Sequence, residues 1–162
     1  HGKGKYTWSD GDEYEGDYLN SKKEGSGIMR YKDGSVYTGA WKRNKREGHG
    51  VLNSPDGAKY EGKWRNDCFH GKGKYTWANG DEYSGNYVNN NIDGYGVIRY
   101  QNGTVYEGAW KKNKREGKGV LTWPSGAKYK GEWKNDSYQD NCNDGSGSKS
   151  FDLFGPKPFL FK

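Results

Sequence analysis

The sequence predicts an all-β protein: one elongated, single-layer antiparallel sheet of six stacked β-hairpins with an aromatic groove. The main observation is the pattern Tyr-x-Gly-x-(Trp/Tyr), which recurs every 23 residues without insertion. A fixed period of this size is typical of a repeat array. Only 30% of the chain is hydrophobic and 16% is aromatic, so a conventional aliphatic core is excluded. Periodic Tyr and Trp nevertheless argue for order, because disordered chains are poor in aromatic residues.

Each repeat contains two further signals besides the tyrosine pattern. A Gly-x-Gly pair opens it, from Gly2/Gly4 in the first copy to Gly117/Gly119 in the sixth. A turn sequence such as Lys32-Asp33-Gly34 or Ala78-Asn79-Gly80 follows, and Asp-Gly and Asn-Gly between alternating segments indicate a hairpin. The order Gly-x-Gly, turn, tyrosine pattern therefore predicts a first strand, a loop and a second strand in every repeat.

Side-chain alternation selects the length of the hairpin loop. A two-residue loop at Asp33-Gly34 would place the aromatic and glycine positions of the two strands on opposite faces. A three-residue loop, Lys32-Asp33-Gly34, pairs Met29 with Tyr37 and Gly27 with Gly39. We therefore predict a three-residue loop in which Gly34 is left-handed, with all strong repeat positions on one face.

The connection between successive hairpins is expected to be a loop of roughly Lys42 to Glu47. One equivalent position of this connection holds residues that tolerate turns and left-handed conformations: Ser21, Asn44, Asp67, Asn90, Asn113 and Asp136. A longer period lies over the short one, because the eight residues from His1 to Trp8 recur as His70 to Trp77. The array thus reads as a three-hairpin unit present twice.

The chain is predicted to divide into a repeat array at residues 1–138, a flexible linker at 139–148 and a hydrophobic peptide at 149–162. The linker contains Gly145-Ser146-Gly147-Ser148, a composition typical of an engineered joint. Four of the five Phe residues lie after this joint. We interpret the last segment as a fused or tethered peptide ligand; a natural disordered tail is the alternative.

The sequence Tyr-Glu-Gly-Lys-Trp64 followed by His70-Gly71-x-Gly73, repeated at 23 residues, resembles the MORN repeat (membrane occupation and recognition nexus). The resemblance covers about residues 1–137. It departs from the family pattern at the histidine of His-Gly-x-Gly, where four copies have Glu24, Glu47, Asp93 and Glu116. The resemblance implies a row of antiparallel hairpins forming a curved sheet with a groove. It also implies a scaffold or adaptor at a membrane, a cytoskeletal structure or a division site.

The aromatic face is the main candidate site. A single sheet has no second layer, so the Tyr and Trp rows are expected to pack on one another and to stay partly open, and exposed apolar surface usually marks a partner site. Packing between neighbouring hairpins is the alternative reading of the same rings. The predicted peptide-binding residues are Trp8, Tyr14, Tyr18, Met29, Tyr31, Tyr37, Trp41, Leu52, Tyr60, Trp64, Trp77, Tyr83, Tyr87, Tyr100, Tyr106, Trp110, Trp123, Tyr129 and Trp133. The expected partner is an extended, Phe-rich hydrophobic peptide, bound in the same molecule or by a neighbour. In the tail its anchors are Phe151, Leu153, Phe154, Phe159, Leu160 and Phe161.

Two basic segments are a second candidate site, at which a membrane-proximal adaptor would bind anionic phospholipids. Their cations are Lys42, Arg43, Lys45, Arg46, Lys111, Lys112, Lys114 and Arg115. The alternative is a pair of solvated turns, partly neutralised by Glu47 and Glu116.

We expect no enzymatic activity, cofactor or metal site. His1, His49 and His70 lack a partnered nucleophile, and the Gly-x-Gly pairs lack the helix that a phosphate-binding loop needs. A nucleic-acid partner is not expected, because carboxylates are interspersed with the cations that give the net charge of +6. Cys68 and Cys142 fit neither a disulfide framework nor a zinc pattern, which favours a reducing, cytoplasmic location. The open ends of the array could pair in a dimer.

Overall fold

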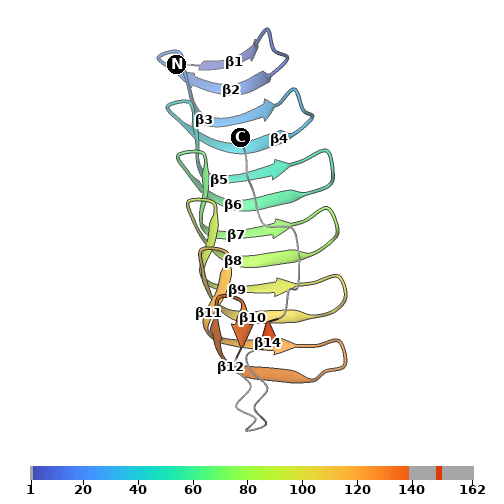
Figure 1. The fold of residues 1–162 in the computed structure, drawn as a ribbon. Helices are drawn as coiled ribbons and strands as arrows, with labels where there is room; N and C mark the ends of the chain where they lie inside the picture. Colours follow the sequence, from blue (N-terminus) through green and yellow to red (C-terminus); the bar gives the residue numbers. More distant parts are fainter. Residues whose placement is uncertain (1, 139–148, 151–162) are drawn as a thin grey trace.

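The computed structural model describes residues 2–138 and 149–150, and it confirms the predicted all-β architecture. The described strands form one antiparallel sheet in which spatial order follows chain order from β1 to β14 (Figure 1). The part of the chain that the structure describes contains no helix, and hence none long enough to cross a membrane. The predicted linker at 139–148 and the tail anchors from Phe151 to Phe161 lie outside the described residues.

The strands are β1 (Gly2–Thr7), β2 (Glu13–Leu19), β3 (Lys22–Arg30), β4 (Val36–Lys42), β5 (Lys45–Asn53), β6 (Lys59–Arg65), β7 (Cys68–Thr76), β8 (Glu82–Val88), β9 (Asn91–Arg99), β10 (Val105–Lys111), β11 (Lys114–Thr122), β12 (Lys128–Lys134), β13 (Ser137–Tyr138) and β14 (Lys149–Ser150).

The three-residue hairpin loop has the predicted register. Met29 lies opposite Tyr37, and Gly27 lies opposite Gly39. The amide of Gly34 donates to the Tyr31 carbonyl at 2.9 Å, and the amide of Tyr31 donates to the Ser35 carbonyl at 2.8 Å. Gly34 has a φ of 90°, the left-handed conformation that a three-residue loop with a bulge requires. The same loop recurs in the other repeats, including Ser54 to Ala58 and Tyr100 to Thr104.

The connections between hairpins are much shorter than expected. Only Arg43 and Asn44 separate β4 from β5, so the predicted loop from Lys42 to Glu47 is wrong in extent. Both residues have positive φ, 48° and 71°, which is the type I′ turn. The sheet is therefore a continuous meander, in which the basic residues flanking each turn belong to strands.

Successive type I′ turns are bonded to one another, which explains the repeated Asn or Asp. The Asn44 side chain accepts from the Lys23 amide at 2.7 Å, while the Asn44 amide donates to the Lys23 carbonyl at 3.0 Å. The acid that replaces the family histidine adds a third bond, since Glu24 accepts from the Arg43 amide at 2.9 Å. Equivalent bonds made by Asp67 and Asn90 lock the turns into a column.

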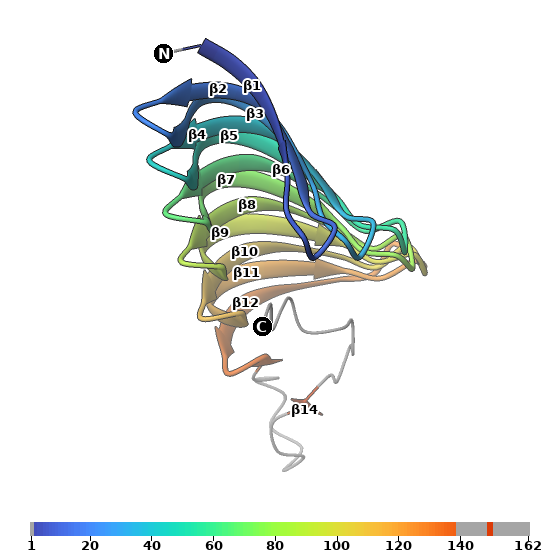
Figure 2. The same cartoon turned by 90° about the horizontal axis from the view of Figure 1, so that it is seen from above.

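The strands are curved, so the sheet has a concave and a convex side (Figure 2). The repeated spacing places side chains in five parallel rows on the concave side, which we call the inner face. The tyrosine row is Tyr6, Tyr14, Met29, Tyr37, Leu52, Tyr60, Tyr75, Tyr83, Ile98, Tyr106, Leu121 and Tyr129. The glycine row is Gly4, Gly16, Gly27, Gly39, Gly50, Gly62, Gly73, Gly85, Gly96, Gly108, Gly119 and Gly131.

Two rows lie between the glycines and the type I′ turns. The tryptophan row is Tyr18, Trp41, Trp64, Tyr87, Trp110 and Trp133, and the turn row is Lys23, Arg46, Phe69, Ile92, Arg115 and Tyr138. A loop row precedes the three-residue loops: Trp8, Tyr31, Ser54, Trp77, Tyr100 and Trp123.

Candidate functional site: the aromatic inner face

Each tyrosine ring of the repeated pattern lies along its own strand and covers the glycine that follows two residues later in the sequence, as Tyr37 covers Gly39. A Cβ atom on Gly50 of the next strand would lie 2.3 Å from the Tyr37 hydroxyl oxygen, so the glycine row provides the floor for the rings. The Tyr37 hydroxyl donates to the Ala40 carbonyl at 2.9 Å. Ala40 lies where the β4–β5 register shifts between Gly39 and Trp41, so the tyrosine bonds to backbone at the bulge.

The tryptophan row joins neighbouring repeats through edge contacts and hydrogen bonds. Trp64 contacts Tyr60 of its own repeat at a centroid distance of 5.2 Å and Tyr37 of the preceding repeat at 5.1 Å. The Trp64 indole also donates to the Gly50 carbonyl at 3.1 Å. Since each tryptophan contacts tyrosines of two repeats, the row carries the interface between hairpins.

The turn row covers the rings from above, with cations in half of its positions. The Arg46 guanidinium carbon lies 4.3 Å from the Trp64 ring centroid and 5.7 Å from that of Tyr37. It is held there by Asp67, whose carboxylate accepts from the guanidinium Nε at 3.1 Å. At the equivalent place in the third repeat Phe69 stacks on Tyr60 at 3.7 Å. In the turn row, an arginine and an apolar ring therefore play the same part, which is to cover the aromatic rings beneath them.

The loop row approaches the turn row from the other side of the glycines. The Lys23 ammonium lies 5.2 Å from the Trp8 ring, and Trp123 lies 6.5 Å from Tyr138. At these two places the loop row and the turn row approach each other over the glycine row. Burial correspondingly lowers the pKa of Lys23.

The predicted peptide-binding residues all lie on the inner face, but most of them are buried. Trp8, Tyr18, Tyr31, Tyr100, Trp123 and Tyr129 are partly exposed. The buried members are Tyr14, Met29, Tyr37, Trp41, Leu52, Tyr60, Trp64, Trp77, Tyr83, Tyr87, Tyr106, Trp110 and Trp133. The expectation that the tyrosine row stays partly open is therefore wrong for most of it, because the turn row covers it.

Burial of the tyrosines changes their ionisation. Burial, with smaller contributions from Tyr18 and Asp17, raises the pKa of Tyr14 to about 12. Burial also raises the pKa of Tyr37, Tyr60 and Tyr83 well above the ordinary value. Neutral phenols at physiological pH can donate to the bulge carbonyls, as the geometry requires.

Sequence reasoning missed the turn row apart from Arg46 and Arg115. These residues recur at the 23-residue period, but the supposed long connection placed them in a loop instead of a strand. The signal that identifies them is a two-residue turn such as Asn66-Asp67 or Asn89-Asn90, since neighbouring Asn and Asp residues favour the type I′ conformation. The second residue after each turn then points to the inner face.

The basic segments divide between two environments. Lys42, Arg43 and Lys45 are exposed beside one type I′ turn, whereas Arg46 turns inward. The second segment behaves alike: Lys111, Lys112 and Lys114 are exposed, and Arg115 is buried between Tyr106 and Trp133. Only the first three cations of each segment can meet an outside surface.

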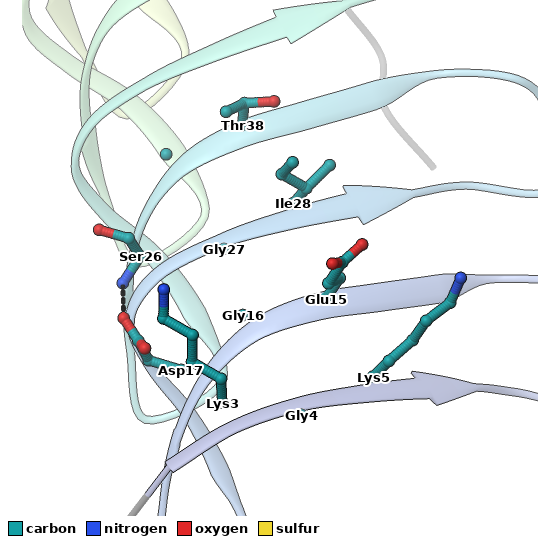
Figure 3. Close-up of a pocket in the computed structure, with 11 residues that line it drawn as sticks. Lys3, Gly4, Lys5, Glu15, Gly16, Asp17, Ser26, Gly27, Ile28 and Thr38 are labelled. Atoms are coloured by element: carbon teal, nitrogen blue, oxygen red, sulfur yellow. Dashed lines mark hydrogen bonds between the residues drawn. The ribbon is translucent and has the colours of Figure 1, made fainter.

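The convex, outer face is polar. At the β1 end it has a depression of about 510 Å³ over the glycine row, lined by residues that include Lys5, Glu15 and Thr38 (Figure 3). At its rim the Ser26 amide donates to Asp17 at 2.9 Å (Figure 3). Lys5 pairs with Glu13 at 3.1 Å on the same face. Its lining combines charged side chains with apolar surface from the glycine row and Ile28. Among the described residues no group of His, Cys, Asp and Glu could hold a metal ion.

Several solved structures match this chain with low identity and low TM-score. The SAS-4 (dCPAP) TCP domain of Drosophila melanogaster, in complex with a proline-rich motif of Ana2 (dSTIL), is 16% identical with a TM-score of 0.45, over 81% of this chain and 90% of that one. The TCP10c domain of Drosophila melanogaster Sas-4 is 16% identical with a TM-score of 0.41, over 81% and 99%. The wild-type TCP10 domain of Danio rerio CPAP is 17% identical with a TM-score of 0.26, over 79% and 71%. These similarities are too low to support a functional conclusion.

Comparison with curated proteins gives no significant match. The family model described as the MORN repeat, in contrast, matches residues 1–13, 14–36, 37–59, 60–82, 83–105, 106–128 and 129–138 in unbroken succession. The matched segments change at Tyr14, Tyr37, Tyr60 and their equivalents, the residues that begin the tyrosine pattern. The chain belongs to the MORN repeat family.

Proposed function

We propose that this chain is a non-enzymatic protein-interaction scaffold whose inner face binds an extended hydrophobic peptide. The observation that best supports this is the loop row, in which Trp8, Tyr31, Tyr100 and Trp123 stay partly exposed at equivalent positions. Aromatic residues with one accessible side are typical of interaction sites. Membership of the MORN family is consistent with a protein-interaction role.

The spacing of the loop row fits a peptide that runs along the stack. Equivalent residues of neighbouring repeats are two strands apart, or about 10 Å at ordinary strand spacing. An extended peptide advances about 3.3 Å per residue, so two anchors three residues apart would meet a neighbouring pair such as Trp8 and Tyr31, or Tyr100 and Trp123. Ser54 and the buried Trp77 separate these two pairs. Phe151 and Phe154 of the tail have this separation.

The tail is the candidate ligand that the chain itself supplies. β14 at Lys149–Ser150 pairs with β13, so the tail begins beside Tyr138 of the turn row. Its composition supplies apolar anchors, and Gly155-Pro156 disfavours a helix. Binding within one molecule would be favoured by the effective concentration of a tethered segment.

Calorimetric titration tests this proposal. A chain shortened to residues 1–148, checked for folding by circular dichroism, should bind a synthetic peptide of residues 149–162. Tyr100→Ala in the loop row should weaken binding about tenfold, the loss expected for one aromatic anchor. Val97→Ala, on the outer face of the same hairpin, is the matched control and should have no effect. Absence of binding, or equal binding of a scrambled peptide, would exclude the proposed peptide site.

A second function is supported by the exposed cations of the type I′ turns. Lys42, Arg43 and Lys45, with Lys111, Lys112 and Lys114, lie at the same end of their strands. They could contact an anionic phospholipid surface at about 1 kcal/mol per cation near the surface. Co-sedimentation with phosphatidylserine vesicles should fall with salt and after replacement of these six residues by Gln. Binding that resists both changes would exclude this function.

A further inference from the structure

The turn row contains three cations, and one of them lacks an acidic partner. The Arg46 and Arg115 side chains each donate from Nε to the Asp of the following type I′ turn, at 3.1 Å and 3.2 Å. At the equivalent place beside Lys23 the turn residue is Asn44, whose side chain accepts from the Lys23 backbone amide at 2.7 Å. Lys23 forms no ion pair in the part of the chain that the structure describes.

The choice between Asn and Asp in these turns follows the residue that covers the rings. Both fit the turn, because either side chain accepts from the backbone amide of the turn-row residue. Asp accompanies the two arginines, whereas Asn accompanies two apolar residues. The pairs are Arg46 with Asp67, Arg115 with Asp136, Phe69 with Asn90 and Ile92 with Asn113. Lys23 with Asn44 departs from this rule, since it is a cation beside a turn that holds no compensating charge.

The Lys23 ammonium lies among aromatic rings. Its Nζ atom is 4.3 Å from the Trp41 ring centroid, 5.2 Å from that of Trp8 and 5.3 Å from that of Tyr14. Its hydrogen-bond partner in the described residues is the Met29 sulfur at 4.0 Å, which is a weak acceptor. The side chain is half-buried, and burial lowers its pKa. A partly desolvated ammonium of this kind is stabilised by an anion that reaches its open side.

This position belongs to the interior of the sheet. Lys23 is on β3, which pairs with β2 and β4, and the acid of a pair such as that of Arg46 comes from the following turn. The missing charge is therefore a property of the sequence between β3 and β5. Trp8, beside the ammonium, is partly exposed, so a ligand on the inner face can reach both groups.

The turn row changes from basic to apolar along the stack. Phe69 on β7 and Ile92 on β9 provide an apolar cover in the middle of the array. Lys23 and Phe69 are four strands apart, or about 19 Å at ordinary strand spacing. An extended peptide spans this distance with about six residues. An acid and an apolar anchor at that separation would thus meet the two ends of this stretch.

We propose that Lys23 is an anion subsite of the inner face, which takes the carboxylate of an Asp or Glu side chain in a bound peptide. This inference rests on the proposed peptide function, and it requires an acid about six residues from the apolar anchor that lies against Phe69. The carboxylate accepts the hydrogen bonds for which the described residues offer the Met29 sulfur. The tail cannot supply this group while it starts from β14 at the other end of the stack, since its acid, Asp152, is two residues beyond Ser150. The occupant is therefore an acidic peptide bound in trans.

Three synthetic peptides, added to the full 162-residue chain, test the subsite. The neutral peptide is residues 149–162 with Asp152→Asn, followed by Gly-Ser-Gln and amidated. The second ends in Gly-Ser-Glu, which places an acid six residues after Phe159, and the third keeps Asp152, seven residues before Phe159, and ends in Gly-Ser-Gln. The two acidic peptides cover both directions in which a peptide can run along the face. The one whose acid reaches Lys23 should bind about fivefold more tightly than the neutral peptide in calorimetry. The tail competes equally with all three peptides, so the ratio of affinities is the readout.

Three variants of the chain assign this preference to the ammonium. Lys23→Met keeps a stem over the rings and should remove the preference. Lys23→Arg combined with Asn44→Asp reproduces the pair of Arg46 with Asp67, so it keeps a cation in place and should also remove the preference. Lys22→Gln is the matched control, because it removes the same charge from an exposed neighbour, and it should keep the preference.

The possible failures are distinguishable. Equal affinities of the three peptides for the unchanged protein would overturn the subsite and leave the peptide function of the inner face intact. A preference that survives in Lys23→Met would place the acid elsewhere, and one that Lys22→Gln also removes would reflect net charge; either result overturns the subsite. Absence of binding by all three peptides would overturn both proposals.

Discussion

Gly50→Ala tests whether the glycine row is needed to leave space for the tyrosine rings that pack against it. In a strand, Ala is ordinarily favoured over Gly by roughly 0.5–1 kcal/mol, because Gly loses more conformational freedom on folding. At Gly50 the added Cβ atom would lie 2.3 Å from the Tyr37 hydroxyl oxygen and 2.5 Å from two carbons of its ring. Tyr37 is fully buried, so the ring has no free space into which it can move.

The expected cost combines two effects. Overpacking a buried site costs about 1–3 kcal/mol. Displacement of the ring also breaks the 2.9 Å bond from the Tyr37 hydroxyl to the Ala40 carbonyl, which adds about 1 kcal/mol. We therefore expect Gly50→Ala to lower the free energy of unfolding by about 2–4 kcal/mol, opposite in sign to the intrinsic preference.

Denaturant unfolding followed by tryptophan fluorescence measures this difference. Gly2→Ala, where the Cβ atom meets nothing within 4 Å, is the control and should change stability by less than about 0.5 kcal/mol. In a Tyr37→Leu background the ring is absent, so Gly50→Ala should cost little, and the double-mutant cycle should give a large coupling energy. An unchanged or increased stability for Gly50→Ala alone would refute the role assigned to the glycine row.

The remaining predictions concern turns, covering side chains and pH. Asn90→Ala should lower the free energy of unfolding by about 2 kcal/mol, because Asn90 has a φ of 68° and its side chain accepts from the Phe69 amide at 2.7 Å. Asn90→Gly should lower the free energy of unfolding by about half as much. A lower melting temperature for Asn90→Gly than for Asn90→Ala would contradict this prediction. Arg46→Ala should lower the free energy of unfolding by about 1–3 kcal/mol, because it uncovers the Trp64 ring. Arg46→Ile places at this position the residue type that Ile92 provides in the turn row, so its melting temperature should stay close to that of the unchanged protein. The contribution of the buried Tyr14 phenol to stability should be constant below about pH 10 and be lost as pH rises toward 12, because burial raises its pKa to about 12 and the unfolded chain ionises first. Circular dichroism together with tyrosinate absorbance follows this transition, and loss of structure well before tyrosinate appears would rule out the explanation.

The sequence determined which residues repeat and which of them share a face. The alternation of side chains along a strand has a period of two, so only a three-residue loop could bring Met29 opposite Tyr37. Fold class and hairpin register therefore followed from spacing, whereas the family followed from the resemblance of the repeated motif. The positions of the glycines were also predicted, although their detailed contacts were not.

Only the tertiary structure decided how the inner face is covered. The connection at Arg43-Asn44 is a two-residue turn, so the strands continue further than composition indicated and carry Arg46 and Phe69 over the rings. Whether a ring such as Tyr37 is exposed or buried depends on neighbours from two other strands, and these are set by curvature and by contacts between repeats. A periodic pattern specifies the direction in which a side chain points. Its burial depends on which neighbouring side chains cover it, and these neighbours are determined only when the repeats pack together.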